Sequence, residues 1–469
     1  MTRAKGAAWA LAATSLPMFM VAVDNLVVTN ALTVIARDLG TDQTGLQWVM
    51  NGYILPFAGL LLAGAALGDR IGRRRVFVWG IGLFTLASAA CALATSPGML
   101  IAARVLQGAG AAAILPVSLT LAVAAVDPAR RPLAVGVWGG VNGMGIALGP
   151  MAGGLVTQGL DWHWIFWINV PVGLVALPLA MWAIRESTGL PRPLDVPGTL
   201  LSCGAVGAAV WTIVQSAGDE VSPVRTLAGI ALTVVLLTAF ALRQRSAPYP
   251  LVPPHLYRVR AFMLSNVLAL AMYFGVFGSI FFLAQFLQGP MGYSPLEAGL
   301  RTLPWTVAPM VAVPLTGLLM TRVGGWLLQA IGCLAQAVAL TWLALIARPG
   351  VSYGAMVGAM VLAGVGMGLV FAANPATVIG SVEEHEHNLA SGMNNTIREF
   401  GGALGIAVLT VVYTQGGLRS AVLTGAAVVF VGAFAGLAIG RTPPRPGSAP
   451  VPSASLSAPS GRREPSRRP

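Results

Sequence analysis

The chain has 469 residues, of which 56% are hydrophobic and only 9% are charged, whereas a soluble globular domain has roughly 25% charged residues. This composition excludes a soluble globular protein and predicts an integral membrane protein. The net charge of +12 comes from arginines in short loops and a tail beside apolar segments, which favours anionic lipid headgroups over nucleic acid as the partner.

Apolar segments long enough to cross a bilayer recur along the whole chain. A hydrocarbon core about 30 Å thick needs about 20 apolar residues of helix. The first segment follows Arg3 and Lys5 and is longer than the apolar region of a signal peptide, about 7 to 15 residues, so we expect it to be retained. We predict an all-α protein with fourteen membrane spans, at residues 9–35, 46–67, 76–95, 98–126, 133–157, 164–184, 197–216, 226–242, 261–287, 296–320, 325–346, 352–377, 389–414 and 420–440.

Basic residues predict the orientation of these spans. If the N-terminus is cytoplasmic, fifteen Lys and Arg residues lie inside and five lie outside, before the tail is counted. Basic residues prefer the cytoplasmic side. Because Lys5 is the only lysine, the composition also hints at GC-rich DNA. We therefore predict a multi-pass protein of a bacterial cytoplasmic (inner) membrane, with both termini cytoplasmic.

The loop after the second span has a copy in the second half of the chain. The residues Ala65, Leu67, Asp69, Arg70 and Gly72 correspond to Gly317, Leu319, Thr321, Arg322 and Gly324, each 252 residues later. Copies in the same orientation indicate two homologous halves. We predict a six-helix half at 1–185, a linker with two inserted spans at 186–260, a second six-helix half at 261–440 and a disordered basic tail at 441–469.

The loop after the second span is itself a candidate site. Its glycines suit a tight turn, its arginines suit the negative leaflet, and Asp69 can pair with an arginine or cap the next helix. A merely basic loop would explain the arginines but not the ordered Gly, Asp and Gly. The candidate gating residues are Asp69, Arg70, Gly72, Arg73 and Arg74.

Two charged residues lie inside apolar spans. Asp24 in span 1 is costly in hydrocarbon unless it is protonated, paired or wetted, and burial favours its protonated form. It is the main candidate for proton coupling, and the alternative is a permanently protonated acid in a helix contact. Arg104 in span 4 either faces a partner or a wet cavity, or snorkels to the surface.

Span 5 carries a stripe of small residues with a proline. Glycines at every fourth position leave a flat helix face for close packing, and Pro150 bends the helix. An ordinary packing face is the plainer interpretation. The residues concerned are Gly145, Gly149, Pro150, Gly153 and Gly154.

Further polar and aromatic residues could line a cavity for a lipophilic substrate. In span 13, the neighbours Arg398 and Glu399 point about 100° apart, so we expect no mutual salt bridge. Glu399 is a second candidate for proton coupling, and a helix end in water is the alternative. The predicted cavity residues are Asn25, Asn51, Tyr53, Gln107, Phe274, Phe277, Phe281, Gln285, Asn394 and Asn395.

Taken in this order and in these spans, the motifs resemble the major facilitator superfamily, and in particular its fourteen-span drug/proton antiporter family. The resemblance implies that the Asp69 loop is a gating latch, that Arg104 and Gln107 take part in proton transfer, and that the span 5 motif belongs to an exporter. The span 1 pattern keeps Asp24 but departs at its Thr, Asn and Pro positions, which leaves the substrate open.

We therefore expect a monomeric transporter that exchanges protons for lipophilic drugs or antibiotics, including cationic ones, by rocking of the two halves. No nucleotide-binding loop appears, so protons are the expected coupling ion, without cofactor or metal. A proton-coupled importer or a facilitator of a metabolite is the alternative. A membrane-embedded enzyme is remote, because the histidines form no catalytic constellation inside a span, and His385 and His387 fit a solvated loop better than a metal site.

Overall fold

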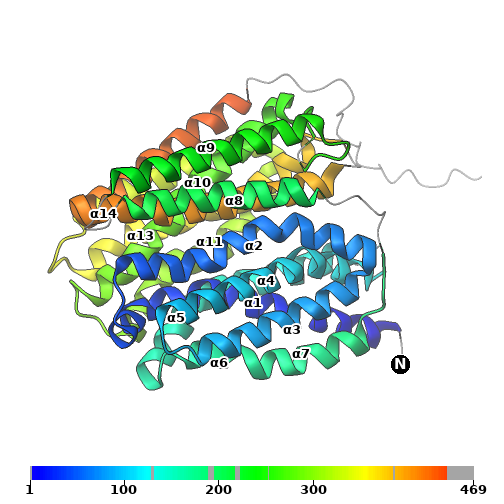
Figure 1. Cartoon of the computed structure of the whole chain (residues 1–469), viewed down its shortest axis with the longest axis horizontal. Helices are drawn as coiled ribbons and strands as arrows, with labels where there is room; N and C mark the ends of the chain where they lie inside the picture. Colours follow the sequence, from blue (N-terminus) through cyan, green and yellow to red (C-terminus); the bar gives the residue numbers. More distant parts are fainter. Residues whose placement is uncertain are drawn as a thin grey trace, which may run out of the picture.

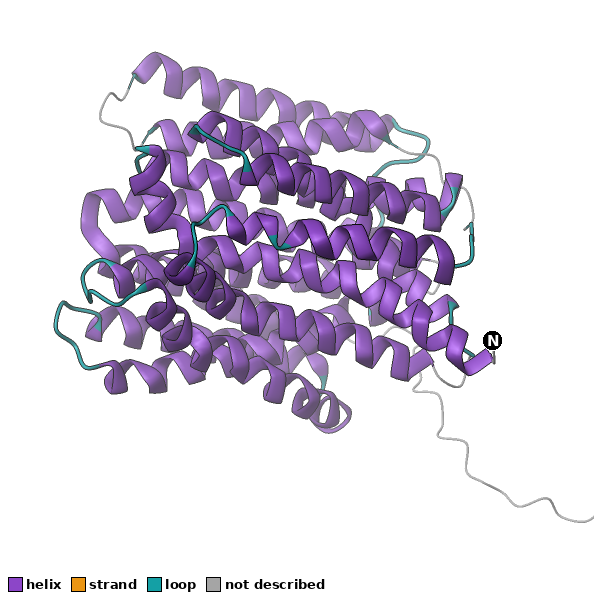
Figure 2. Ribbon diagram, turned by 90° about the horizontal axis from the view of Figure 1, so that it is seen from below, coloured by secondary structure: helices purple, strands orange, loops and turns teal. Residues whose placement is uncertain are grey.

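A computed structural model describes residues 3–127, 131–188, 195–216, 222–251, 253–383 and 386–440. These residues form helices and loops and contain no strand (Figure 2). The predicted tail at 441–469 lies outside them. The elements are α1 (Arg3–Leu39), α2 (Gln43–Ile71), α3 (Arg73–Ala92), α4 (Pro97–Ala124), α5 (Arg131–Gly159), α6 (Trp164–Trp167), α7 (Asn169–Ala183), α8 (Val196–Gln215), α9 (Pro223–Ser246), the short 3-10 helix η2 (Leu256–Arg258), α10 (Arg260–Gln288), α11 (Pro295–Val323), α12 (Gly325–Ile346), α13 (Tyr353–Gly380) and α14 (His387–Ile439).

The prediction of an all-α, multi-pass membrane protein is confirmed. Twelve helices of the described residues are long and apolar enough to span a membrane. In addition, α5 covers the predicted span at 133–157, and α14, with 53 residues, covers both 389–414 and 420–440. Gly417 has non-helical angles (φ 69°, ψ −175°) between these two parts of α14. The count of fourteen spans stays a prediction.

Local sequence signals explain where several helices begin and end. Ser96, Ser222 and Ser294 each accept a hydrogen bond from the backbone N–H three residues later, and a proline follows each of them. A serine cap followed by proline is a favoured helix start. Gly72 after α2 and Gly324 after α11 have φ angles of 116° and 87°, which glycine adopts without steric cost.

The close packing of α3 on α4 has a counterpart in the packing of α12 on α13. A Cβ atom added at Gly80 of α3 would lie 3.0 Å from the carbonyl oxygen of Gly110 in α4. At Gly332 of α12, 252 residues after Gly80, a Cβ would lie 2.7 Å from the carbonyl oxygen of Gly366 in α13. Gly80 and Gly332 are equivalent at the 252-residue spacing, whereas their partners Gly110 and Gly366 differ from that spacing by about one helical turn, so both helix pairs approach closely through glycines.

The helices α1–α7 form one group and α10–α14 another, lying side by side (Figure 1). The inserted helix α8 packs against both α2 and α14, and α9 packs mainly on α8. Most apolar side chains of α9 are exposed, including Val224 at 75%. The inserted helices therefore lie on the outside of the bundle, where α8 touches both groups.

Candidate functional site

The centre of the first helix group contains a buried ion pair. One guanidinium nitrogen (Nη1) of Arg104 lies 2.5 Å from Oδ2 of Asp24, and both side chains are fully buried. Arg104 therefore does not snorkel to the surface, and that alternative is wrong. The predicted cost of an ion inside a span is offset here by an opposite charge and hydrogen bonds.

Three further polar side chains complete the pair. Gln107 and Asn169 each donate a hydrogen bond to Oδ1 of Asp24, at 2.8 and 3.1 Å. Gln107 also accepts one from Arg104 at 2.8 Å, and Ser88 accepts from Gln107 and Asn169. The cluster thus joins α1, α3, α4 and α7. Neither Ser88 nor Asn169 was among the predicted site residues.

Next to the ion pair lie buried polar atoms that have no partner in the described part of the chain. The guanidinium carbon of Arg104 lies 4.2 Å from the ring centroid of Tyr53, a favourable cation–π distance. The Tyr53 hydroxyl and Nη2 of Arg104 lack hydrogen bonds within the described residues. Asn51, two residues before Tyr53 on α2, is also buried, and both of its side-chain amide atoms lack partners there as well. Such atoms are costly when left unsatisfied, and a bound polar group or water would satisfy them.

The second helix group supplies Glu399 beside this region. Glu399 is 9% exposed and interacts electrostatically with Tyr53 of α2. It lies well inside α14, which begins at His387, so the interpretation as a helix end in water is wrong for Glu399. Glu399 thus adds a buried acidic side chain from α14, which packs against α2, the helix of Tyr53.

Arg398 faces a different set of groups from Glu399. Its guanidinium donates to the hydroxyl of Tyr273 and, at 3.0 Å, to Oδ1 of Asn395. It also lies 4.5 Å from the Tyr273 ring centroid. No salt bridge between Arg398 and Glu399 occurs in the described residues, in agreement with the prediction.

The predicted cavity residues do not all gather at one place. Phe274 and Phe281 are buried in α10, and Phe277 is partly buried. Asn394 donates to the side-chain oxygens of Asn266 and Asn374, at 3.0 and 2.9 Å. Its amide is thereby held inside the second helix group. The side chain of Asn25 lies outside the described part of the structure.

The predicted gating loop is held by contacts within the first helix group. Asp69 and Arg73 form an ion pair at 2.7 Å. The carboxylate of Glu186, just beyond α7, accepts hydrogen bonds from the backbone N–H groups of Arg74 and Arg75, at 2.9 and 3.3 Å. Glu186 could not be recognised as part of this site from sequence, because it lies more than a hundred residues from the loop it caps.

The glycine motif of α5 forms two different contacts. Gly145, Gly149 and Gly153 face α1, where a Cβ at Gly153 would lie 2.3 Å from the Val27 carbonyl oxygen. Gly154 faces α11 of the other helix group, and a Cβ there would lie 2.2 Å from the Pro295 carbonyl oxygen. The plain interpretation, a close-packing face, is correct, and Gly154 extends it to the boundary between the groups.

A substitution at Gly154 should therefore be far more damaging than one at a glycine of α5 that has open space around it. Gly154→Val must displace backbone at the α11 contact, and we expect overpacking to cost about 1 to 3 kcal/mol of stability. Gly143→Val is the matched control, because nothing lies within 4 Å of a Cβ at Gly143. Unfolding of the purified variants in detergent measures both, and equal losses would contradict the assigned contact.

Pro150 of the same motif takes part in a polar contact. Its carbonyl oxygen accepts a 2.6 Å hydrogen bond from the side chain of Asn30 in α1. The backbone carbonyl of Asn30 in turn accepts from Gln288 of α10 at 2.9 Å. The glycine and proline motif is thus connected through α1 to the second helix group.

Several uncharged side chains join the two groups at this end, opposite the arginine-rich loop. Gln288 also accepts a hydrogen bond from Thr33, and Gln43 donates to Gln285 at 2.5 Å. Gln285, a predicted cavity residue, is therefore engaged in this contact through its oxygen. The groups are closed against each other at this end by amide and hydroxyl groups rather than by ion pairs.

Removing Gln288 should loosen this end of the bundle. Gln288→Ala deletes two hydrogen bonds between the groups, each worth about 0.5 to 1.5 kcal/mol. We expect roughly ten-fold faster backbone hydrogen exchange at the adjoining ends of α1 and α10, with no change near Gly72. Gln158→Ala, which removes only an exposed contact to Ser294, should change exchange much less; equal acceleration in both variants would contradict the assignment.

The fold and the buried charged cluster define a multi-pass membrane transporter. Residues 14–406 and 352–469 match the model of the Major Facilitator Superfamily. The chain belongs to this superfamily, and the predicted resemblance is confirmed.

Relatives in sequence include resistance and export proteins. The chain is 37% identical over 415 residues to the puromycin resistance protein pur8 of Streptomyces alboniger, covering 87% of this chain and 82% of that protein. It is 33% identical over 411 residues to a tetracenomycin C resistance and export protein of Streptomyces glaucescens, covering 87% and 76%. Among solved structures, a peptide transporter POT in complex with alafosfalin has a TM-score of 0.72 at 15% identity, covering 94% of this chain and 98% of that chain; at this identity the likeness concerns the fold alone.

Proposed function

We propose that this protein is a proton-coupled antiporter that exports small lipophilic compounds, antibiotics among them, by alternating access. The observation that carries the proposal is the fully buried ion pair between Asp24 and Arg104. A buried acid held by a cation and neutral donors changes its interactions sharply when it gains or loses a proton. The export proteins among its relatives support the direction of transport.

The geometry suggests how protons and substrate compete. Protonation of Asp24 removes the charge that holds Arg104, so Arg104 becomes free to reorient toward Tyr53, whose hydroxyl has no partner within the described residues. Substrate that binds beside Tyr53 would displace Arg104 back toward Asp24, and this would favour loss of the Asp24 proton. Glu399, close to Tyr53, is the second proposed proton site, and no chemical conversion of the substrate is required.

Alternating access requires that the two helix groups separate at one end while they close at the other. The amide contacts around Gln288 close the end opposite the arginine-rich loop. We assign the arginine-rich end to the cytoplasm of a bacterial inner membrane, with both termini inside and the protein acting as a monomer. In this assignment the described conformation is the one closed toward the outside of the cell.

Transport by reconstituted vesicles tests the proposal. Vesicles that contain the full chain are given an imposed proton gradient, and movement of ethidium, a lipophilic cation, is followed by fluorescence. An antiporter moves ethidium against the direction of proton flow, and reversing the gradient should reverse its movement. Movement in the same direction as the protons would indicate a symporter, and movement independent of the gradient would indicate a facilitator; either result contradicts the proposal.

A further inference from the structure

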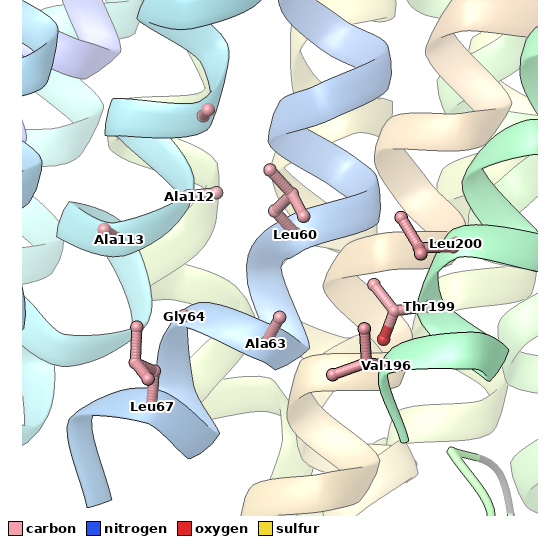
Figure 3. Close-up of a pocket in the computed structure, with 10 residues that line it drawn as sticks. Leu60, Ala63, Gly64, Leu67, Ala112, Ala113, Val196, Thr199 and Leu200 are labelled. Carbon is pink, nitrogen blue, oxygen red and sulfur yellow. The ribbon is translucent and has the colours of Figure 1, made fainter. Parts of the chain in front are cut away.

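An apolar groove lies on the outer surface of the bundle between α2, α4 and α8 (Figure 3). Its volume is about 250 Å³. The only side-chain hydroxyl that lines it belongs to Thr199, and this hydroxyl donates to the backbone carbonyl of Asp195 at 3.0 Å. The lining therefore offers hydrocarbon contact and no free donor for a polar ligand.

Small residues create the groove. A Cβ at Gly64 would lie 2.4 Å from the carbonyl oxygen of Ala112, so α2 and α4 are in backbone contact at its floor. On the other side, α2 touches α8 where a Cβ at Gly59 would meet the sulfur of Cys203. From this contact toward the arginine-rich end, α2 and α8 leave the groove between them.

The surroundings of the groove are those of a membrane-facing surface. Each of the three helices is a candidate membrane span. Val196 and Leu200, which form the α8 wall, are 54% and 64% exposed. Lipid hydrocarbon is the solvent for such side chains, so the groove is open to acyl chains from the side.

An arginine follows the groove-lining residues of α2 toward the arginine-rich end of the helix. Leu60, Gly64 and Leu67 of α2 line it at helical spacing, and Arg70 continues that face of the helix by one turn. Arg70 is exposed and has no ion pair or hydrogen bond with any described residue. By contrast, Arg73 is paired with Asp69, within the same loop.

We propose that this groove binds one acyl chain of an anionic phospholipid, whose headgroup lies against Arg70. The apolar wall accepts any hydrocarbon chain. Arg70, one turn beyond Leu67 at the depth of the lipid headgroups, would select a negatively charged headgroup. A lipophilic cation would be repelled at the same place. This inference does not depend on the proposed proton coupling.

Native mass spectrometry of the full-length chain in detergent tests the proposal. Phosphatidylglycerol and phosphatidylcholine of equal chain length are titrated separately, and the affinity of the first bound lipid is measured. We expect Arg70→Gln to weaken phosphatidylglycerol binding about five-fold, the equivalent of about 1 kcal/mol per basic residue near a lipid surface, with little effect on phosphatidylcholine. Arg245→Gln, at another exposed helix end, is the matched control and should leave both affinities unchanged.

Two variants fill the groove itself. Ala63→Phe from α2 and Val196→Phe from α8 should each weaken binding of both lipids several-fold, because both lipids lose the acyl-chain site. The same substitution on the lipid-facing side of α9, Ala231→Phe, should have no effect. Val196 is exposed, so its variant should fold even if Ala63→Phe does not.

The proposal is wrong if Arg70→Gln behaves like Arg245→Gln, or if folded groove-filling variants retain lipid binding. A loss of tetraphenylphosphonium binding in the groove-filling variants, with unchanged phosphatidylglycerol binding, would identify a substrate site instead and would also overturn it. Because the readout is lipid affinity, failure here is distinguishable from failure of antiport.

Discussion

Asp24→Asn should abolish resistance while the protein still reaches the membrane. Asparagine keeps the shape and an acceptor for Arg104, but it cannot exchange a proton. A membrane potential of about 100 mV supplies about 2.3 kcal/mol per proton, enough for an outward gradient of about fifty-fold when an uncharged drug is exchanged for one proton. We expect the variant to lose this gain, and the inhibitory concentration of exported drugs in an efflux-deficient host to fall to that of the empty host.

The matched control lies on the same helix. Asp38→Asn changes the same group, but Asp38 accepts a 2.8 Å hydrogen bond from the indole of Trp162, which an asparagine oxygen also accepts. Resistance should survive in this variant. Membrane levels of both variants are compared by immunoblot, and equal protection by wild type and Asp24→Asn would remove Asp24 from the mechanism.

Arg104→Leu should strongly destabilise the protein. Removing one partner of a buried ion pair leaves the other charge uncompensated, at a cost of about 3 to 5 kcal/mol. Gln107 and Asn169 still donate to Asp24, but neither supplies a positive charge. The free energy of unfolding, measured by titrating the purified protein with SDS, should fall by that order.

A second substitution distinguishes the loss of the ion-pair interaction from a general loss of stability. In the double variant Asp24→Asn/Arg104→Leu no buried charge remains at this place, so we expect the pair to show a coupling energy of about 1 to 3 kcal/mol and the double variant to be more stable than Arg104→Leu alone. Transport should not return, because the proton site is gone. Additive losses in the two single variants would show that the ion pair contributes no interaction of its own.

The charged residues of the candidate site were predictable, because the free-energy cost of a charged side chain inside an apolar span can be recognised from the neighbouring residues alone. An acid and an arginine inside apolar spans stand out in sequence, since each needs a partner in a membrane. The sequence could not say that Asp24 and Arg104, 80 residues apart, are partners of each other. Their pairing depends on the rotation of α1 against α4, which packing along both helices sets.

Other polar residues show the limit of the same reasoning. Asn394 and Gln285 were predicted to line a substrate cavity, yet Asn394 is bound to Asn266 and Asn374, and Gln285 accepts from Gln43. Ser88, which supports the ion pair, carries no signal in sequence because serines are common in membrane helices. Composition identifies polar residues in spans, but it does not tell which neighbour each one meets.

The sequence by itself determined that this is an all-helical, multi-pass membrane protein, and it located the turns at Gly72 and Gly324; the relation between two halves stays a prediction from the repeat spacing. These properties follow from hydropathy, repeat spacing and backbone conformation, which act over a few neighbouring residues. Only the tertiary structure decided that Arg104 meets Asp24, that Gly154 touches α11 and that α8 bounds a groove with α2 and α4. Such contacts join residues far apart in the chain, and they are set by how all the helices pack together.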